Sequence, residues 1–359
     1  MSHPYSRAPD TAFWSRSVAK NWSPSSLAPE VYIRPGDKIA SAGSCFASNM
    51  VPHIEKAGFQ YIRAELANPL FRVPAEGLGY EKFSAAYGHI YTARQLLQTI
   101  QRALGLLEPA ERYWKQWPFF VDPFRPGLRY KARSVFEFDA LTKQHLNAVL
   151  EALRQADVFV FTLGLTEAWT SRADGAVYPA CPGTIAGKFD PSKHAFVNFS
   201  ANESRDDLLE FVRLARTINQ DLRVILTVSP VPLVATASDR HVVWSTAYSK
   251  ATLRVAAEEV CTAVAGVTYF PSYELVAGPQ APPESLGADR RTVSEHAIQE
   301  VMAVFLKKAV AVSAPAKAPP PLAQALSQAL INAECEEAMV ERPEPVGRLS
   351  QLARMLRIK

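Results

Sequence analysis

The segment Gly43-Ser44-Cys45 combines a flexible backbone position with two side chains that can act as nucleophiles. It follows the short apolar run 38–42 and precedes 46–57, where apolar residues recur at helical spacing. A strand, a tight turn and a helix are therefore predicted, with Gly43 permitting the turn without a Cβ clash. Because backbone N–H groups and the helix dipole lower the pKa of a thiol at a helix start, Cys45 is a candidate nucleophile. Ser44 is either a second nucleophile or a helix cap.

The residue types of this segment also fit a purely structural role. Gly43 and Ser44 would then end a strand and cap a helix, and Cys45 would be a small buried side chain. On residue types alone this interpretation is favoured over catalysis. The other three cysteines are widely spaced, so the sequence predicts four reduced thiols and no zinc or redox motif: Cys181, Cys261 and Cys335.

A cysteine nucleophile needs a base within hydrogen-bond reach, and histidine is the usual one. His241 follows a predicted strand and a polar loop, so it can reach the edge of a parallel sheet where ligands bind. It is the predicted base, against the alternative that it bonds to its own turn. His89, in a tyrosine-rich turn, ranks below it. Glu167 directly follows a buried strand and could orient a histidine, hold a substrate hydroxyl or act as a base, or else be a capping carboxylate.

Two cationic side chains could bind an anionic substrate. Arg125, within 122–126, and Lys250, at a predicted helix start, could hold an acidic group or the phosphates of coenzyme A. Salt bridging and helix capping explain them at least as well.

The elements that must position these residues are alternating strands and helices. Apolar, β-branched runs at 157–163, 222–228 and 266–270 predict buried strands. Apolar residues spaced three and four apart predict helices at 93–104, 140–156, 206–218, 249–264 and 294–310. This order is typical of an α/β protein whose mainly parallel sheet is covered by helices on both faces. The aromatic-rich stretch within about 65–135 is too long for a simple crossover and is interpreted as an insertion over the site.

Composition sets the wider limits. The chain has 359 residues, 48% hydrophobic and 21% charged, which predicts one globular domain over 1–312, a proline-rich linker at 313–321 and a helical tail at 322–359. The net charge of +4 is spread without a basic run, so nucleic acid is not an expected partner. No apolar stretch is long enough for a membrane span or signal peptide, and a cytoplasmic protein is expected.

The residues Gly43-Ser44-Cys45-Phe46-Ala47 match the signature of the GSCFA family, and the resemblance extends from the N-terminus to about residue 310. Further segments support it: 87–92, 122–126, 162–169, 227–232 and 248–250. The resemblance implies a bacterial protein with the three-layer α/β/α fold of SGNH hydrolases. It also implies that Gly43-Ser44-Cys45 takes the place of their Gly-Asp-Ser block, with Cys45 at the nucleophile position.

Two other SGNH blocks are matched less closely. The stretch from Gly164 to Glu167 looks like the Gly-x-Asn-Asp block that contributes to the oxyanion site, with Thr166 in the place of Asn. The stretch from Asp289 to Thr292 looks like the Asp-x-x-His block, but Thr292 stands where the histidine would be. His296, one helical turn later, could in principle replace that histidine.

The resemblance implies an esterase or O-acyltransferase acting on an acyl ester or thioester, with a small molecule or a bacterial surface polysaccharide as substrate. Cys45 or Ser44 would attack the carbonyl, and backbone N–H groups with Thr166 would stabilise the oxyanion. The alternative is a non-catalytic ligand-binding module, to which the missing Asp-x-x-His histidine also points; a scaffold role of the tail is a third. No metal site and no required cofactor are expected, and acyl-coenzyme A is a candidate donor.

Overall fold

The computed structural model describes residues 3–27, 32–65, 80 and 82–307, apart from the Cys45 side chain. The predicted linker and tail lie outside the described residues, and so does part of the predicted insertion. Among the described helices, none is long and apolar enough to cross a membrane.

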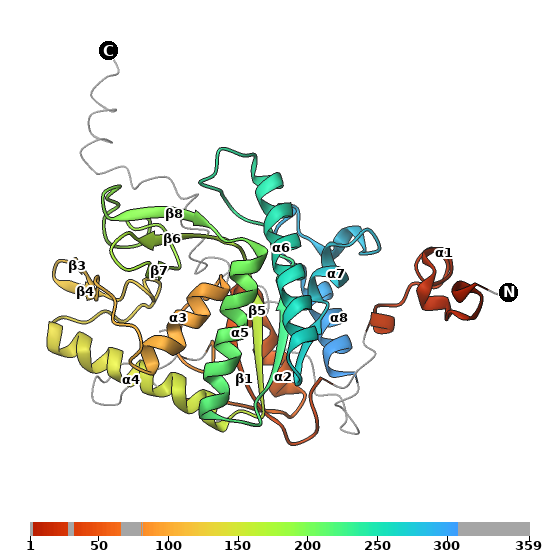
Figure 1. The fold of residues 1–359 in the computed structure, drawn as a ribbon, viewed down its shortest axis with the longest axis horizontal. Helices are drawn as coiled ribbons and strands as arrows, with labels where there is room; N and C mark the ends of the chain where they lie inside the picture. The colour runs from red at the N-terminus through yellow and green to blue at the C-terminus, as the bar shows by residue number, and fades with distance from the viewer. Residues whose placement is uncertain (1–2, 28–31, 66–79, 81, 308–359) are drawn as a thin grey trace, which may run out of the picture.

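A five-stranded parallel sheet forms the centre of the protein (Figure 1). Its order is β10-β9-β5-β1-β2, which numbered along the chain is 2-1-3-4-5, an order of doubly wound α/β folds. The strands are β1 (Lys38–Gly43), β2 (Gln60–Tyr61), β5 (Val158–Leu163), β9 (Arg223–Val228) and β10 (Val267–Phe270). Four of the five confirm predicted strands, and β2 was not predicted.

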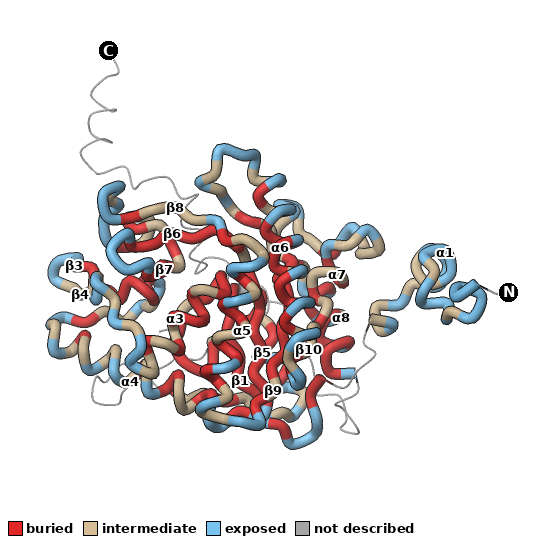
Figure 2. The backbone as a smooth tube through the Cα atoms, viewed as in Figure 1, coloured by how far each residue is buried: buried red, intermediate tan, exposed pale blue. Residues whose placement is uncertain are grey.

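Helices cover both faces of the sheet because successive side chains of a strand point to opposite sides. On β5, Phe159 and Phe161 pack into one apolar cluster, while Val158 and Val160 pack into the other. The first cluster includes α3 (Ala93–Ala103), α4 (Val135–Gln155), α5 (Ala201–Ile218) and α6 (Val242–Ala263). The second includes α2 (Cys45–Lys56), α7 (Ser272–Ala277) and α8 (Glu295–Leu306). The buried sheet between two helical layers (Figure 2) confirms the predicted α/β/α arrangement.

A small antiparallel sheet lies across the end of the parallel sheet at which β5 ends (Figure 1). Its strands are β6 (Glu167–Ser171), β7 (Val177–Tyr178) and β8 (His194–Asn198), and a separate hairpin is formed by β3 (Trp114–Gln116) and β4 (Phe119–Val121). The predicted insertion over 65–135 is not confirmed as a unit. Within that range α3 belongs to the core, because Leu96 and Ile100 pack in the first apolar cluster.

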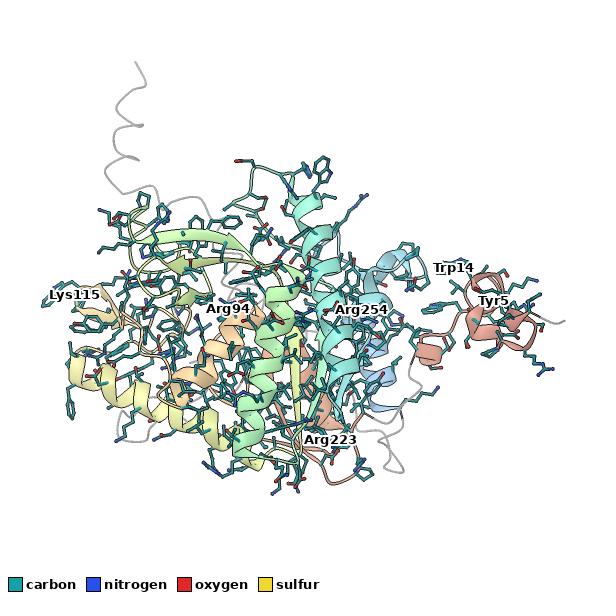
Figure 3. All side chains as sticks on the ribbon, viewed as in Figure 1. Tyr5, Trp14, Arg94, Lys115, Arg223 and Arg254 are labelled. Carbon is teal, nitrogen blue, oxygen red and sulfur yellow. The ribbon has the colours of Figure 1, made fainter. Side chains whose placement is uncertain are left out.

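Helices within one layer are joined by polar contacts as well as apolar ones. Arg94 on α3 donates from Nε to Oδ1 of Asp207 on α5 at 2.6 Å (Figure 3).

At the other side of the molecule, the N-terminal segment carries η1 (Pro4–Arg7), η2 (Asp10–Ala12), α1 (Trp14–Ser17) and η3 (Pro24–Leu27). Of these, η3 contacts α8, while Tyr5 and Trp14 lie away from the sheet (Figure 3).

Candidate functional site

Gly43 ends β1 in a conformation that only glycine can adopt there. Its φ is +148°, and a Cβ would lie 2.9 Å from the Thr162 carbonyl oxygen on β5 and 2.9 Å from the Ala47 Cβ. Gly43 pairs with Thr162 in the parallel register, so the clash would be with the neighbouring strand itself. The chain then turns directly into α2, which begins at Cys45. The predicted strand, turn and helix are confirmed.

Ser44 is the N-cap residue of α2 but does not cap it with its side chain. It is 6% exposed, and its Oγ has no hydrogen-bond partner among the described residues. A serine nucleophile needs a base hydrogen-bonded to its hydroxyl, and here none is present. The next residue, Cys45, occupies the first helical position, where the orphan N–H groups of the first turn and the positive end of the dipole lie.

Residues 89–91 bridge the ends of β1 and β5. The Ile90 N–H donates to the Gly43 carbonyl at 3.0 Å, and the Tyr91 carbonyl accepts from Gly164 N–H at 2.9 Å. His89 is therefore held directly beside the turn, where its buried ring stacks on Tyr91 with centroids 5.7 Å apart. Of the histidines considered as a base, His89 is the one whose chain neighbour bonds to the Gly43-Ser44-Cys45 turn.

Gly164 and Lys250 meet at the end of β5. A Cβ on Gly164 would lie 3.2 Å from the Tyr91 carbonyl oxygen, so the absent side chain permits this close approach. Lys250 on α6 is 1% exposed and donates from Nζ to the Gly164 carbonyl at 2.5 Å. The Lys250 amine is therefore buried inside the site and bound to a backbone carbonyl, and it is not a surface group that could bind a phosphate.

Thr166 is held by two polar residues, Asn198 and Ser249, that were not among the predicted site residues. Its N–H donates to Ser249 Oγ at 2.8 Å, and its Oγ1 donates to Asn198 Oδ1 at 2.6 Å. The Thr166 hydroxyl proton is therefore already used, whereas the Asn198 amide keeps its own N–H donors. The amide beside Thr166 thus comes from Asn198 on β8 and not from the segment 164–167. No local motif marks Asn198, because strand pairing alone brings it there.

Glu167 begins β6 and is 7% exposed. Its Oε1 accepts a hydrogen bond from Thr236 Oγ1 at 2.7 Å. The carboxylate borders a cavity of about 260 Å³ between β6–β8 and the loop 233–237. Cys181 also borders it, and burial raises the pKa of that thiol to about 11.

His241, the predicted base, is exposed and caps its own helix: its Nδ1 accepts from Val243 N–H at 3.2 Å. Ser249 lies eight residues further along α6, which corresponds to roughly 12 Å of helix. The structure therefore does not bring His241 to the end of β5. The prediction of His241 as the base is wrong, and its ring bonds to its own turn, as the alternative interpretation predicted. His296 is 65% exposed and lies 4.0 Å from Glu300.

Asp289 and Thr292 bond to each other instead of forming a dyad. Asp289 Oδ2 accepts from Thr292 Oγ1 at 2.6 Å, and its Oδ1 accepts from the Thr292 N–H at 2.9 Å. These bonds lower the pKa of Asp289 despite the opposing effect of burial. Asp289 and Thr292 thus stabilise their own turn, and this segment supplies no histidine that could act as a base.

Arg125 lies in a buried charged cluster, here called the Arg125 network, formed by Glu65, Asp122, Arg125 and His145. Arg125 donates to Asp122 Oδ2 at 2.8 Å and to Glu65 Oε1 at 3.3 Å, and His145 Nδ1 lies 2.6 Å from Glu65 Oε2. Burial opposes ionisation of Glu65, but His145 and Arg125 outweigh it and lower its pKa to about 2. The guanidinium is thus committed to two carboxylates and is not presented to a ligand. Neither here nor elsewhere among the described residues are three His, Cys, Asp or Glu side chains grouped so that they could hold a metal ion.

The GSCFA family profile matches residues 38–305. No curated protein matches the sequence. Among solved structures, a Clostridium thermocellum family 3 carbohydrate esterase is 10% identical, with a TM-score of 0.32 over 76% of this chain and 94% of that one. A family 3 carbohydrate esterase from Talaromyces cellulolyticus is 12% identical, with a TM-score of 0.33 over 76% and 95%.

Proposed function

Because the chain belongs to the GSCFA family, we propose that it is an acyl-transferring enzyme in which the Cys45 thiolate attacks an ester or thioester carbonyl. One observation carries this proposal: Gly43 has φ +148° and no room for a Cβ, and it delivers Cys45 to the first position of α2. A backbone held in a sparsely populated conformation at a strand end is a frequent feature of catalytic sites. Ser44, without a hydrogen-bonded base, is not the proposed nucleophile.

In the proposed reaction the Cys45 sulfur bonds to the acyl carbon, and the alkoxide or thiolate leaving group departs with a proton. His89, beside the turn, is the proposed base that takes the thiol proton and returns it to the leaving group. The backbone N–H groups at the start of α2 stabilise the oxyanion. Lys250 has a positioning role, because its bond to the Gly164 carbonyl holds the end of β5 next to residues 89–91. Water or a second hydroxyl then attacks the acyl-enzyme and releases Cys45.

The acyl group passes to water if the site is open to solvent during the reaction, and to a second hydroxyl if water is excluded. A polysaccharide acceptor, an acyl-coenzyme A donor and a cytoplasmic location stay predictions from the sequence. The alternative of a non-catalytic ligand-binding module is kept as an outcome of the experiment below.

The test is the pH dependence of alkylation by iodoacetamide, read peptide by peptide with mass spectrometry. We expect Cys45 to react with a thiolate pKa well below the ordinary value of about 8.5. His89→Gln should raise that pKa, whereas His241→Gln is the matched control and should leave it unchanged. Cys181 is an internal control, because burial raises its pKa to about 11 and it should react only in strong alkali.

Incubation with p-nitrophenyl acetate should then add an acetyl group to the Cys45 peptide, and Cys45→Ala should abolish the adduct. An inert or ordinary Cys45 thiol would overturn the proposal and leave the ligand-binding module. An effect of His241→Gln in place of His89→Gln would restore His241 as the base.

A further inference from the structure

The cavity beside Glu167 is lined almost entirely by apolar side chains. Trp169 of β6 pairs with Tyr178 of β7 and with Phe196 of β8, so the three side chains form an aromatic wall on the small sheet. Leu233 and Val234, from the loop after β9, also line the cavity. At about 260 Å³ it lies just below the ~300–1,000 Å³ of small-molecule pockets, so it fits a compact ligand. It is built by the small sheet and the loop after β9, and Gly43, Ser44 and Lys250 do not line it.

Glu167 is the one charged side chain that lines the cavity. It is 7% exposed, and its bonding partner, Thr236, is a neutral hydroxyl that donates to one carboxylate oxygen. Within the described part of the chain, no Lys, Arg or His forms an ion pair with it. Burial of a carboxylate without a positive partner is unfavourable, and proteins pair such groups. The missing positive charge is therefore a property that a ligand can supply.

We propose that this cavity binds a compact apolar molecule bearing a primary ammonium group, with the ammonium donating to Glu167 and the apolar body packed on the aromatic wall. An ammonium would gain from the carboxylate and from the faces of the aromatic rings. A sugar would need more polar partners than Glu167, Thr184 and Thr236 provide, and an acyl chain would leave the carboxylate unpaired and further desolvated. The proposal concerns binding alone and goes beyond the reaction proposed for Cys45.

The experiment is calorimetric titration of the full chain at pH 7 with two probes of similar shape, benzylamine and benzyl alcohol. Benzylamine is charged at this pH and should bind at least about tenfold more tightly than the alcohol. Glu167→Gln keeps the shape of the side chain but removes its charge, and should weaken benzylamine at least about tenfold. Glu258→Gln, an exposed carboxylate on α6, is the matched control and should leave both affinities unchanged.

Ala235→Leu narrows the cavity without changing its charge and should weaken both probes. Cooperative unfolding at an unchanged temperature identifies variants that remain folded. The proposal is overturned if benzylamine does not bind, if Glu167→Gln binds it as well as the parent chain, or if benzyl alcohol binds as tightly. Cys45→Ala should bind benzylamine normally, so an unreactive thiol and an empty cavity are separate failures.

Discussion

Arg125 and Glu167 are both almost fully buried, but Arg125 lies between oppositely charged side chains whereas Glu167 bonds to a neutral hydroxyl. In the Arg125 network the buried charges meet opposite charges at hydrogen-bond distance, so their burial is compensated within the protein. At the carboxyl edge of the sheet, Ser44 has no partner among the described residues and Glu167 has a neutral one. The contrast teaches that burial of a charged residue does not mark a site. Incomplete compensation of the buried group is the more informative sign.

The largest effect on stability should come from breaking the compensated region. Arg125→Met leaves Glu65 and Asp122 buried without their shared cation, and should lower the free energy of unfolding by about 3–5 kcal/mol. Chemical denaturation would measure it. Arg254→Met is the control, because that guanidinium is 35% exposed in its ion pairs and its loss should cost under about 1 kcal/mol. Equal losses in the two variants would erase the contrast.

Acid should act on the same network. Glu65 has a folded pKa of about 2 against an ordinary 4.5, so its contribution is complete above pH 4.5 and is lost as the pH falls toward 2. The shift corresponds to roughly 3 kcal/mol. Burial, followed by the Arg125 charge, lowers the pKa of His145. Below about pH 6.5 the unfolded chain therefore takes up a proton on this histidine more readily than the folded protein does, and the free energy of unfolding falls. Denaturation between pH 7 and 3 should show the decline, and Glu65→Gln should flatten it below pH 4.5. An unchanged slope in that variant would contradict the assignment.

Gly43→Ala should lower the free energy of unfolding by roughly 2–3 kcal/mol, because the new Cβ would clash with the Thr162 backbone and alanine is strained at this φ angle. Thermal unfolding measures the loss. Gly58→Ala separates the two causes: its φ is +84° but no atom lies within 4 Å of the added Cβ. If both variants lose the same stability, the close approach at Gly43 has no energetic importance.

The smallest effect is expected for Ser44→Ala. Removing a buried hydroxyl without a partner should change the free energy of unfolding by less than about 1 kcal/mol, and should leave Cys45 alkylation intact. Thr162→Val, which removes another unpartnered buried hydroxyl from β5, is the matched comparison. A loss of Cys45 reactivity in Ser44→Ala alone would show that Ser44 takes part in the chemistry.

The sequence predicted the central sheet because its strands carry strong local signals. Residues 158–163 are all apolar except Thr162, and the segment after the Gly43-Ser44 turn has regular apolar spacing. The small sheet was missed, since β7 has two residues and β6 contains a glutamate and two hydroxyl residues. The early start of α5 was also missed, although Ser200 and Glu203 form a capping box that the sequence displays.

For the candidate site, local sequence could indicate Gly43, Cys45 and Gly164 because each is marked by the turn or strand end around it. It could not predict that Asn198 and Ser249 bond to Thr166, because these residues lie 32 and 83 positions away from it along the chain. His241 was favoured because it follows a strand, but the length of α6 places it well beyond the strand end. The sequence predicted that this helix begins at residue 249, whereas α6 begins at Val242, so the distance between His241 and the strand end could not be predicted.

The bridge at residues 89–91 has a consequence for local opening of the protein. Its amide and carbonyl groups bond to both Gly43 and Gly164, and Gln95 Oε1 and Nε2 in turn bond to the Tyr91 amide and the His89 carbonyl. Because one short loop ties two neighbouring strand ends, opening it releases both at once, and the edge behaves as a single cooperative unit in hydrogen exchange. Order in the turn before Cys45 therefore depends on Gln95 of α3, whose side chain bonds to the bridge at residues 89–91.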